Sequence, residues 1–186
     1  MPCQNLFIDT NVIVDCIIPF RRTKYACSLK LMEKVGEVEQ RDFRAWSTDY
    51  SLSEALGTLK DAKEERLGLK YIDKQVLSTY DIAQMVIIID EFRKTPHFEV
   101  FEPEPIQQKE IFEKVKHVCI QAKDALVLLS ALTLKNKPAT ANSVLVTRDD
   151  RLLIRASRVT DTAHPVDFLD ACPLTCTSRS NCTYRK

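Results

Sequence analysis

The stretch LFIDTNVIV, residues 6–14, places two polar residues in an otherwise apolar run. Residues 6–8 predict a buried strand, and apolar residues resume at 12–14. Burial of an unpaired carboxylate at Asp9 would cost several kcal/mol, so this residue needs a partner. Asn11 carries a short amide that could hold Asp9, or a neighbouring backbone group, in place.

Working outward from this stretch, predicted strands and helices alternate along the chain. A helical segment follows Asp9 directly. Strands are predicted at 4–9, 44–49, 98–103 and 143–147, and helices at 23–35, 51–66, 71–94, 105–118, 122–135 and 149–156, with a last helical turn or two in 165–172. This alternation is typical of an α/β fold, in which helices cover both faces of a parallel sheet. Ligand sites in such folds lie beyond the carboxyl ends of the strands.

Several of these helices carry local signals. Ser51 stands three residues before Glu54, a capping-box pattern that indicates a helix start. Pro105 stands where a helix can begin. The segment 122–135 is apolar nearly all round and predicts a buried helix. The segment 71–94 keeps a helical period of apolar residues through Ile72, Val76, Tyr80, Ala83, Val86 and Ile87.

The composition is that of a globular protein with one main domain. The chain has 186 residues, of which 45% are apolar and 28% charged, and its formal net charge of +1 gives no indication for or against nucleic acid. We expect a domain over 1–172 and a polar, basic tail over 173–186. No basic leader precedes the first apolar stretch, and the apolar run at 85–90 is far shorter than a membrane span of about 20 residues. We therefore expect a cytoplasmic protein without membrane contact.

Two common kinds of site are poorly supported. The three glycines form neither a GxGxxG nor a GxxxxGK[ST] pattern, which argues against a phosphate-cradling loop. The cysteines contain no CxxC pair that would indicate zinc. We expect those within the predicted domain to be small buried residues, namely Cys3, Cys16, Cys27 and Cys119, whereas Cys172, Cys176 and Cys182 lie near the end of the chain.

Four segments each place one carboxylate at the same predicted edge of the sheet. Asp9 ends the first strand, Glu54 and Asp124 lie in the first turns of two helices, and Asp149 follows the last predicted strand. Each of the last three also has a purely structural interpretation. Glu54 could complete the capping box, Asp124 could favour the helix dipole, and Asp149 could be a turn or cap residue.

Taken together, these acids favour a metal site. Carboxylates gathered in one cleft repel one another, and a hard divalent cation such as Mg²⁺ would neutralise them through oxygen ligands. The histidines are isolated and are expected to be surface or structural residues, namely His97, His117 and His164. The residue types therefore indicate an oxygen-ligated cation rather than zinc.

The ordered motifs LFIDTNVIVD, SLSEALGTL, AKDALVLLSAL and VLVTRDDRLL resemble the acidic motifs of PIN-domain ribonucleases over residues 4–155. Many members are VapC-like toxins of VapBC type II toxin–antitoxin systems. The resemblance implies a three-layer α/β/α sandwich and an endoribonuclease that depends on Mg²⁺ or Mn²⁺. It assigns catalysis to Asp9, Glu54, Asp124 and Asp149, the metal to Asp9, Asp124 and Asp149, and supporting roles to Asn11 and Thr147. It also implies a homodimer and, for a toxin, an antitoxin protein as partner.

Some alternatives stay open at this point. Asp150 could share the role of Asp149. The long, charged region 60–95 exceeds what a compact toxin needs, so a housekeeping RNA-processing nuclease is the alternative to a toxin. A catalytically silent RNA-binding protein with this fold is a third possibility. A phosphatase with an aspartyl nucleophile would need a second aspartate where Asn11 stands.

Basic residues near the acids are candidates for RNA binding. Arg148, Arg151 and Arg155, with Arg158, cluster around Asp149, and Arg21, Arg22 and Lys24 follow the first motif. Their guanidinium and ammonium groups could contact phosphates. The alternative interpretation is an ordinary solvated face.

Overall fold

The computed structural model describes residues 3–18, 25–39, 41–66 and 78–169. The predicted tail over 173–186 lies outside these residues. So do the first part of the helix predicted over 71–94, the three cations Arg21, Arg22 and Lys24, and the cysteines near the end of the chain.

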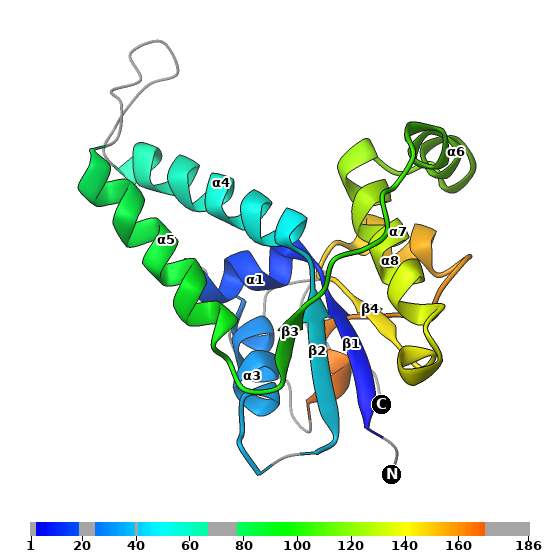
Figure 1. The fold of residues 1–186 in the computed structure, drawn as a ribbon, viewed down its shortest axis with the longest axis horizontal. Helices are drawn as coiled ribbons and strands as arrows, with labels where there is room; N and C mark the ends of the chain where they lie inside the picture. Colours follow the sequence, from blue (N-terminus) through cyan, green and yellow to red (C-terminus); the bar gives the residue numbers. More distant parts are fainter. Residues whose placement is uncertain (1–2, 19–24, 40, 67–77, 170–186) are drawn as a thin grey trace.

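A five-stranded parallel sheet forms the centre of the described structure, in the order β3-β2-β1-β4-β5 (Figure 1). The strands are β1 (Gln4–Ile8), β2 (Phe43–Ser47), β3 (Phe98–Val100), β4 (Val144–Val146) and β5 (Thr162–Ala163). Phe7 pairs with Trp46 of β2 and with Leu145 of β4, so β1 lies in the middle of the sheet. The predicted α/β fold with a parallel sheet is confirmed.

Successive residues of β1 feed two separate apolar cores, because side chains alternate between the faces of a strand. Leu6 and Ile8 pack into the core on one face, whereas Phe7 packs into the core on the other. All three are completely buried. The uninterrupted apolar run that opens the chain is therefore explained by a strand covered on both sides.

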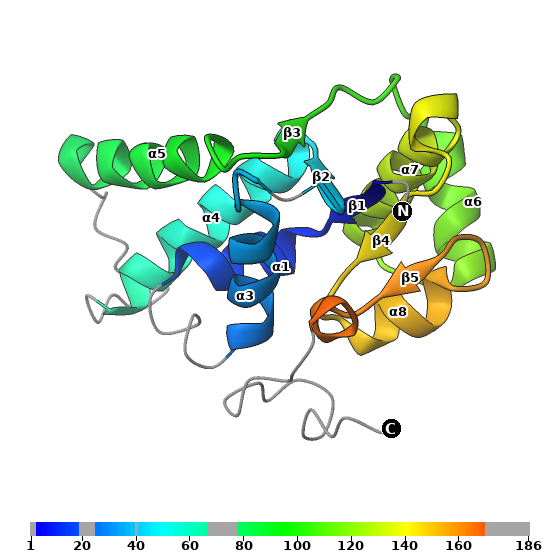
Figure 2. The same ribbon diagram turned by 90° about the horizontal axis from the view of Figure 1, so that it is seen from below.

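Helices cover the two faces in two layers (Figure 2). One layer holds α1 (Thr10–Ile17), α3 (Ala26–Val35), α4 (Asp49–Arg66) and α5 (Thr79–Arg93), and the other holds α6 (Gln108–Val118), α7 (Ala122–Lys135) and α8 (Asp150–Ala156). Short 3₁₀ turns follow at Pro138–Thr140 and Pro165–Phe168. The arrangement is the expected three-layer α/β/α sandwich.

Two predicted helix starts are wrong for identifiable reasons. α4 begins at Asp49 rather than Ser51, because the hydroxyl of Thr48 accepts the backbone N–H of Ser51 at 3.3 Å. α6 begins three residues after Pro105, and the carboxylate of its Glu110 accepts the backbone N–H of Gln107 at 2.9 Å. The side chains that mark the two helix starts are therefore not Ser51 and Pro105, the residues that indicated them in the sequence.

The last strand was not predicted, and the described part of the last predicted helical turns is a 3₁₀ turn. β5 has only two residues, too few for an alternating pattern to indicate it. In the described part of the predicted helical segment 165–172, a 3₁₀ turn spans Pro165–Phe168, and residues 170–172 lie outside the described residues. The side chain of Asp167 closes this turn by accepting the backbone N–H of His164 at 2.8 Å.

The apolar residues of α5 divide between the core and solvent. Met85 and Ile89 are buried, whereas Tyr80 and Ile87 are exposed, together with Ile82 and Val86. α5 packs against α4 and α1 through its buried side. The periodic residues thus predict a helix correctly in the described part of 71–94, but those of them that are described lie on the outer face.

Two of the four cysteines in the described residues differ from expectation. Cys16 and Cys27 are buried, as predicted, but Cys3 and Cys119 are exposed. Cys119 adopts a left-handed backbone conformation at the end of α6, with φ 59°. Its place in a connection between two helices, rather than within one, explains its exposure.

Among the described helices, none taken singly is both long and apolar enough to cross a membrane. α6 and α7 together are long and apolar enough, but the chain bends by 105° between them. Much of α7 is buried against the sheet.

Candidate functional site

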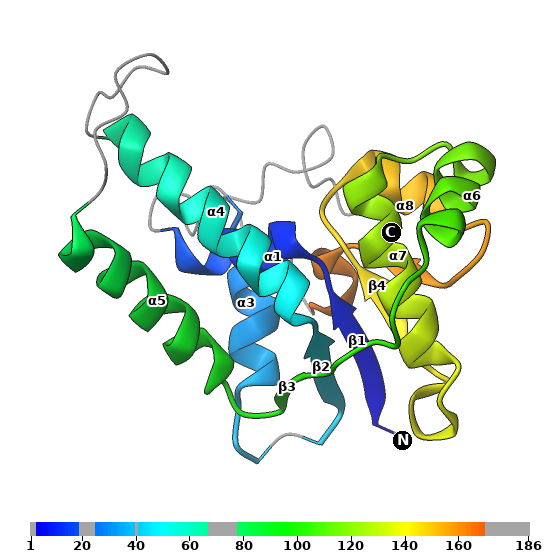
Figure 3. The same cartoon turned by 45° about the horizontal axis from the view of Figure 1, so that its top comes forward.

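The carboxyl ends of the strands gather the starts of several helices at one edge of the sheet. α1 begins directly after β1, α4 after β2, and α8 after β4. The start of α7 also lies at this edge (Figure 3). Because parallel strands end together, four distant segments place their first residues around one space.

Asp9 is the most buried of the four acids at this edge and is only 6% exposed. It is the N-cap residue of α1, yet its side chain makes no capping hydrogen bond to that helix. Its Oδ2 instead accepts hydrogen bonds from Nδ2 of Asn11 and from Oγ1 of Thr147, each at 2.6 Å. The partner that the sequence required for Asp9 is therefore supplied by two uncharged donors.

Burial raises the pKa of Asp9 from 3.8 to about 7. Hydrogen bonds from Thr147 and the Thr10 backbone oppose this rise, and the negative charges of Asp124 and Glu54 add to it. Two uncharged donors thus do not compensate fully for the loss of water around this carboxylate. The influence of Asp124 and Glu54 also indicates that these side chains lie within electrostatic reach of Asp9.

Thr147 connects Asp9 to Asp149. Its Oγ1 donates to Asp9, and it accepts both Nδ2 of Asn11 at 2.8 Å and the backbone N–H of Asp149 at 3.1 Å. Thr147 is completely buried. The supporting positions predicted for Asn11 and Thr147 therefore form a hydrogen-bonded link between the first and last acids.

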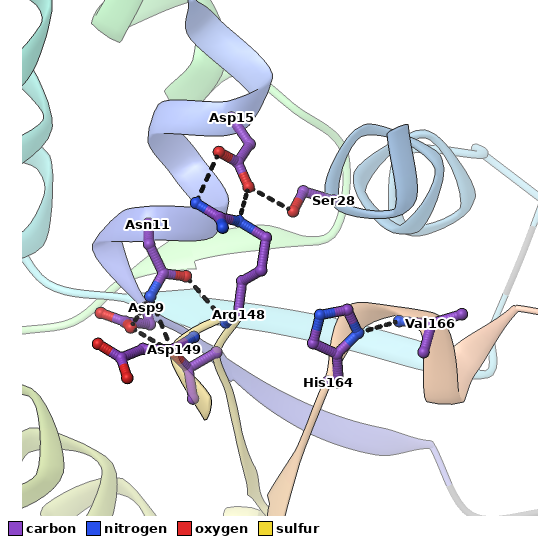
Figure 4. A network of polar contacts seen from close by, with 9 residues as sticks. Asp9, Asn11, Asp15, Ser28, Arg148, Asp149, His164 and Val166 are labelled. Atoms are coloured by element: carbon purple, nitrogen blue, oxygen red, sulfur yellow. Dashed lines mark hydrogen bonds and ion pairs between the residues drawn. The ribbon is translucent and has the colours of Figure 1, made fainter. Parts of the chain in front are cut away.

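Asp149 is the N-cap of α8, which is the structural role that the sequence offered as an alternative to metal binding. Its Oδ1 accepts the backbone N–H groups of Arg151 at 2.8 Å and Leu152 at 3.0 Å. Figure 4 shows the carboxylates of Asp149 and Asp9 pointing to the same side. Capping fixes the carboxylate of Asp149 through one oxygen and is compatible with ligand binding through the other. Asp150, the alternative last ligand, lies in the first turn of α8.

Glu54 and Asp124 complete the acidic edge from α4 and α7. Glu54 pairs with the ammonium of Lys123 at 3.6 Å, which joins the starts of the two helices. The pKa of the half-buried Asp124 is raised, chiefly by burial and then by the charge of Asp149, with Lys123 opposing the rise and Glu54 adding to it. The four predicted acids are therefore coupled in one electrostatic cluster, although Asp9 is far more buried than the others.

Sequence reasoning missed two residues at this edge. Lys123 precedes Asp124 and is the cation nearest the acids in the ion pairs of the described residues. The pKa of Tyr50 is raised by burial and then by Glu54, Asp124 and Asp9, which places its hydroxyl near the cluster. A usable signal existed for Tyr50, because it stands four residues before Glu54 and so on the same face of α4.

The predicted RNA-binding arginines have different surroundings. The guanidinium of Arg148 forms an ion pair with the buried Asp15 at 2.5 Å and is therefore engaged inside the protein. Arg155 donates from Nη1 to the carbonyl of Cys119 at 2.7 Å. Arg151 lies exposed at the start of α8, near the capped carboxylate of Asp149. Of these three, Arg151 is best placed for contact with phosphate.

The donor set at this edge fits a hard divalent cation. The four acids supply only carboxylate oxygens, and burial, with a smaller contribution from like charges, raises the pKa values of Asp9 and Asp124; a cation would stabilise their charged forms. Within the described part of the chain, no three His, Cys, Asp or Glu side chains already form a complete metal-binding group. The fit therefore rests on the chemistry of the donors rather than on a preformed shell.

Comparisons with known proteins give no family assignment. A scan against models of known protein families finds no match to this chain, and no curated protein matches it either.

Proposed function

We propose that this protein is a PIN-like ribonuclease that hydrolyses RNA phosphodiester bonds with the help of Mg²⁺ or Mn²⁺. The observation that carries this proposal is the coupling of Asp9, Glu54, Asp124 and Asp149 at the carboxyl edge of a parallel sheet. A divalent cation at such carboxylates supplies positive charge that activates water and stabilises the phosphoryl transition state. Asp9, Asp124 and Asp149 are the residues proposed to hold it.

The protein's own groups have distinct tasks in this proposal. Asn11 and Thr147 fix the orientation of the Asp9 carboxylate through Oδ2. The N-terminal amides of α8 fix Asp149 through Oδ1. Glu54 is proposed as a further ligand, or as the base that orients and accepts a proton from the attacking water. Because both fixed carboxylates are held before substrate arrives, little reorganisation is needed at the reaction step.

RNA is proposed as the substrate because cations border the acids. Lys123 is 57% exposed in its side chain and lies beside Glu54, and Arg151 lies at the start of α8. These side chains could hold phosphates on either side of the bond to be cut. Tyr50, 37% exposed, offers an aromatic ring on which a single-stranded base could stack.

A protein partner is proposed on separate grounds. The exposed apolar side chains of α5, namely Tyr80, Ile82, Val86 and Ile87, form a strip of the kind found at protein–protein contacts. This strip supports the homodimer implied by the resemblance, and an antitoxin protein is the alternative occupant. A toxin role is proposed on the resemblance alone, with housekeeping RNA processing as the alternative.

The test uses the full chain, stripped of metal with a chelator and then supplied with Mn²⁺ or Mg²⁺. We expect cleavage of single-stranded RNA only after the cation is added, and no cleavage by Asp9→Asn. Arg44→Met, a change near the start of β2 and away from the acidic edge, serves as the control. Cation-independent cleavage, or full activity of Asp9→Asn, would contradict the proposal. Turnover of a phosphomonoester but not of RNA would favour a phosphatase.

A further inference from the structure

Arg148 lies in the loop between Thr147 and Asp149. Its side chain is directed away from the carboxylates of Asp9 and Asp149 (Figure 4). Its Nε donates to Oδ2 of Asp15 at 2.5 Å, and its Nη2 donates to Oδ1 at 3.3 Å. This bidentate ion pair fixes the plane of the guanidinium group as well as its position.

Both members of this ion pair have a further contact, Asp15 with Ser28 and Arg148 with Tyr25. Asp15 is completely buried, and its Oδ2 also accepts the hydroxyl of Ser28 at 2.9 Å. The guanidinium carbon lies 3.6 Å from the centre of the Tyr25 ring. The side chain of Arg148 is therefore only 16% exposed, which leaves little of it available to solvent.

α1 holds Arg148 at two points. The side chain of Asn11 accepts the backbone N–H of Arg148 at 3.0 Å, while Asp15 holds the guanidinium. These two residues are four positions apart and so lie on the same face of the helix. α1 is also the helix that Asp9 begins, so one rigid element carries the first acid and grips the loop that bears the last.

We propose that Arg148 is a positioning residue, whose ion pair with Asp15 clamps the loop 147–149 against α1 and thereby sets Thr147 and Asp149 against Asp9. This inference rests on the proposed function and names the device that regulates the geometry of that site. It replaces phosphate binding as the role of Arg148. RNA contacts at this edge are then left to Lys123 and Arg151.

If Arg148 clamps the loop, a double variant can regain the stability of the protein without regaining the geometry of the acidic site. Arg148→Met removes the guanidinium group that faces the buried carboxylate of Asp15, and we expect it to lower the unfolding temperature. In the double variant with Asp15→Asn, both charges are gone and the Asn side chain can still accept the Ser28 hydroxyl. The double variant is therefore expected to regain most of the lost unfolding temperature, while the loop stays unclamped.

The experiment measures four properties of wild type, Arg148→Met, the double variant and the matched control Arg44→Met. These are unfolding temperature, hydrogen exchange of the backbone amides 147–152, Mn²⁺ affinity, and kcat and KM for RNA. We expect both Arg148 variants to show exchange raised about tenfold in this loop. Their Mn²⁺ affinity and kcat should fall about 10- to 100-fold, with KM within about twofold of wild type. Arg44→Met should match wild type in all four.

Three results would overturn the clamp. One is a double variant that recovers Mn²⁺ affinity and kcat along with its unfolding temperature, because the ion pair would then be structural only. Another is a rise in KM with unchanged kcat, which would return Arg148 to RNA binding. The third is unchanged amide exchange in both variants. If wild type neither binds Mn²⁺ nor cuts RNA, the proposed function fails, while amide exchange still decides on the clamp.

Discussion

The carboxylate of Asp9 and the hydroxyl of Thr147 lie 2.6 Å apart, although 138 positions separate them in the chain. Both residues follow strands that are neighbours in the sheet, β1 and β4. The hydrogen bond therefore connects the end of β1 with the end of β4, and substitution of Thr147 tests how the carboxylate of Asp9 is held.

Asp9→Asn should make the cation-free protein more stable at high pH and not at low pH. Burial raises the pKa of Asp9 to about 7, so the folded state binds this proton more tightly than the unfolded state does. The wild type's stability relative to the variant is therefore greatest below about pH 4 and falls as pH rises to 7 and beyond. We expect the difference in unfolding free energy to change by at most about 4 kcal/mol over this interval.

The measurement is denaturant unfolding of both proteins, without divalent cations, at several pH values from 4 to 8. Cleavage of RNA should be lost in the variant at every pH. A pH-independent difference in unfolding free energy would contradict the pKa assigned to Asp9.

Thr147→Val should raise the pKa of Asp9 further, because the hydroxyl of Thr147 lowers it. The variant also leaves the backbone N–H of Asp149 without its acceptor, at a cost of about 1–3 kcal/mol in unfolding free energy. Carbon-13 NMR of the Asp9 carboxyl measures the first effect. Thr140→Val is the matched control, because Thr140 is buried and donates to the Leu134 carbonyl. It should lose stability and leave the Asp9 titration unchanged.

Variants of Asp149 should separate its capping role from its charge. Asp149→Asn keeps an oxygen that can accept the Arg151 and Leu152 amides, whereas Asp149→Ala loses it and about 0.5–2 kcal/mol of stability. Both should lose Mn²⁺ affinity and RNA cleavage by a similar factor. Asp150→Asn is the companion variant. A larger loss of Mn²⁺ affinity there would make Asp150 the last ligand instead.

Lys123→Met should weaken RNA binding with little effect on folding. The Lys123–Glu54 pair is solvent-accessible, so its removal should change the unfolding free energy by less than about 1 kcal/mol. Loss of one phosphate contact should reduce the salt dependence of single-stranded RNA affinity by about 0.7 in log–log slope. The pKa of Asp124 should rise, since Lys123 lowers it.

Lys135→Met serves as the control for this variant. Lys135 lies at the other end of α7 and pairs with Asp161 at 2.5 Å, so its loss also removes one positive charge and one ion pair. Equal salt slopes for the two variants would mean that RNA does not contact Lys123.

Replacement of Val86 and Ile87 by glutamate should abolish self-association through α5. Both side chains are more than 40% exposed, so the change should leave the unfolding free energy within about 0.5 kcal/mol of wild type. Light scattering after size-exclusion chromatography measures the mass. Phe112→Glu, on the exposed face of α6, is the control and should keep the wild-type mass. A wild-type mass for the α5 variant would place any dimer contact elsewhere.

The main features of the fold follow from local patterns. The apolar run before Asp9 predicts a strand covered on both faces, because every side chain in residues 6–8 is apolar. Alternation of such runs with helical patterns predicts the parallel sheet, and the sheet predicts that Asp9 and Asp149 lie at one edge. These steps need only the periodicity of strands and helices and the common direction of parallel strands.

The rest depends on contacts between distant residues, which periodicity does not encode. Asp15 and Arg148 each look like ordinary polar residues in the sequence, and their ion pair is defined only once β4 lies beside β1. The same holds for Lys123 and Glu54, which meet because α7 and α4 start at the same edge. Two helix starts were predicted wrongly for a more local reason, since the side chain of Thr48 caps α4 in place of the predicted Ser51, and α6 begins after Gln107 rather than at Pro105.

The strand order also governs when the acidic edge is completed during synthesis of the chain. β4 inserts beside β1, but the chain must first pass through β2 and β3. A growing polypeptide therefore presents Asp9 and Glu54 well before it can add Asp124, Thr147 and Asp149. Until then the carboxylate of Asp9 stands beside an open strand edge, and the four acids can meet only after the chain has been synthesised as far as Asp149.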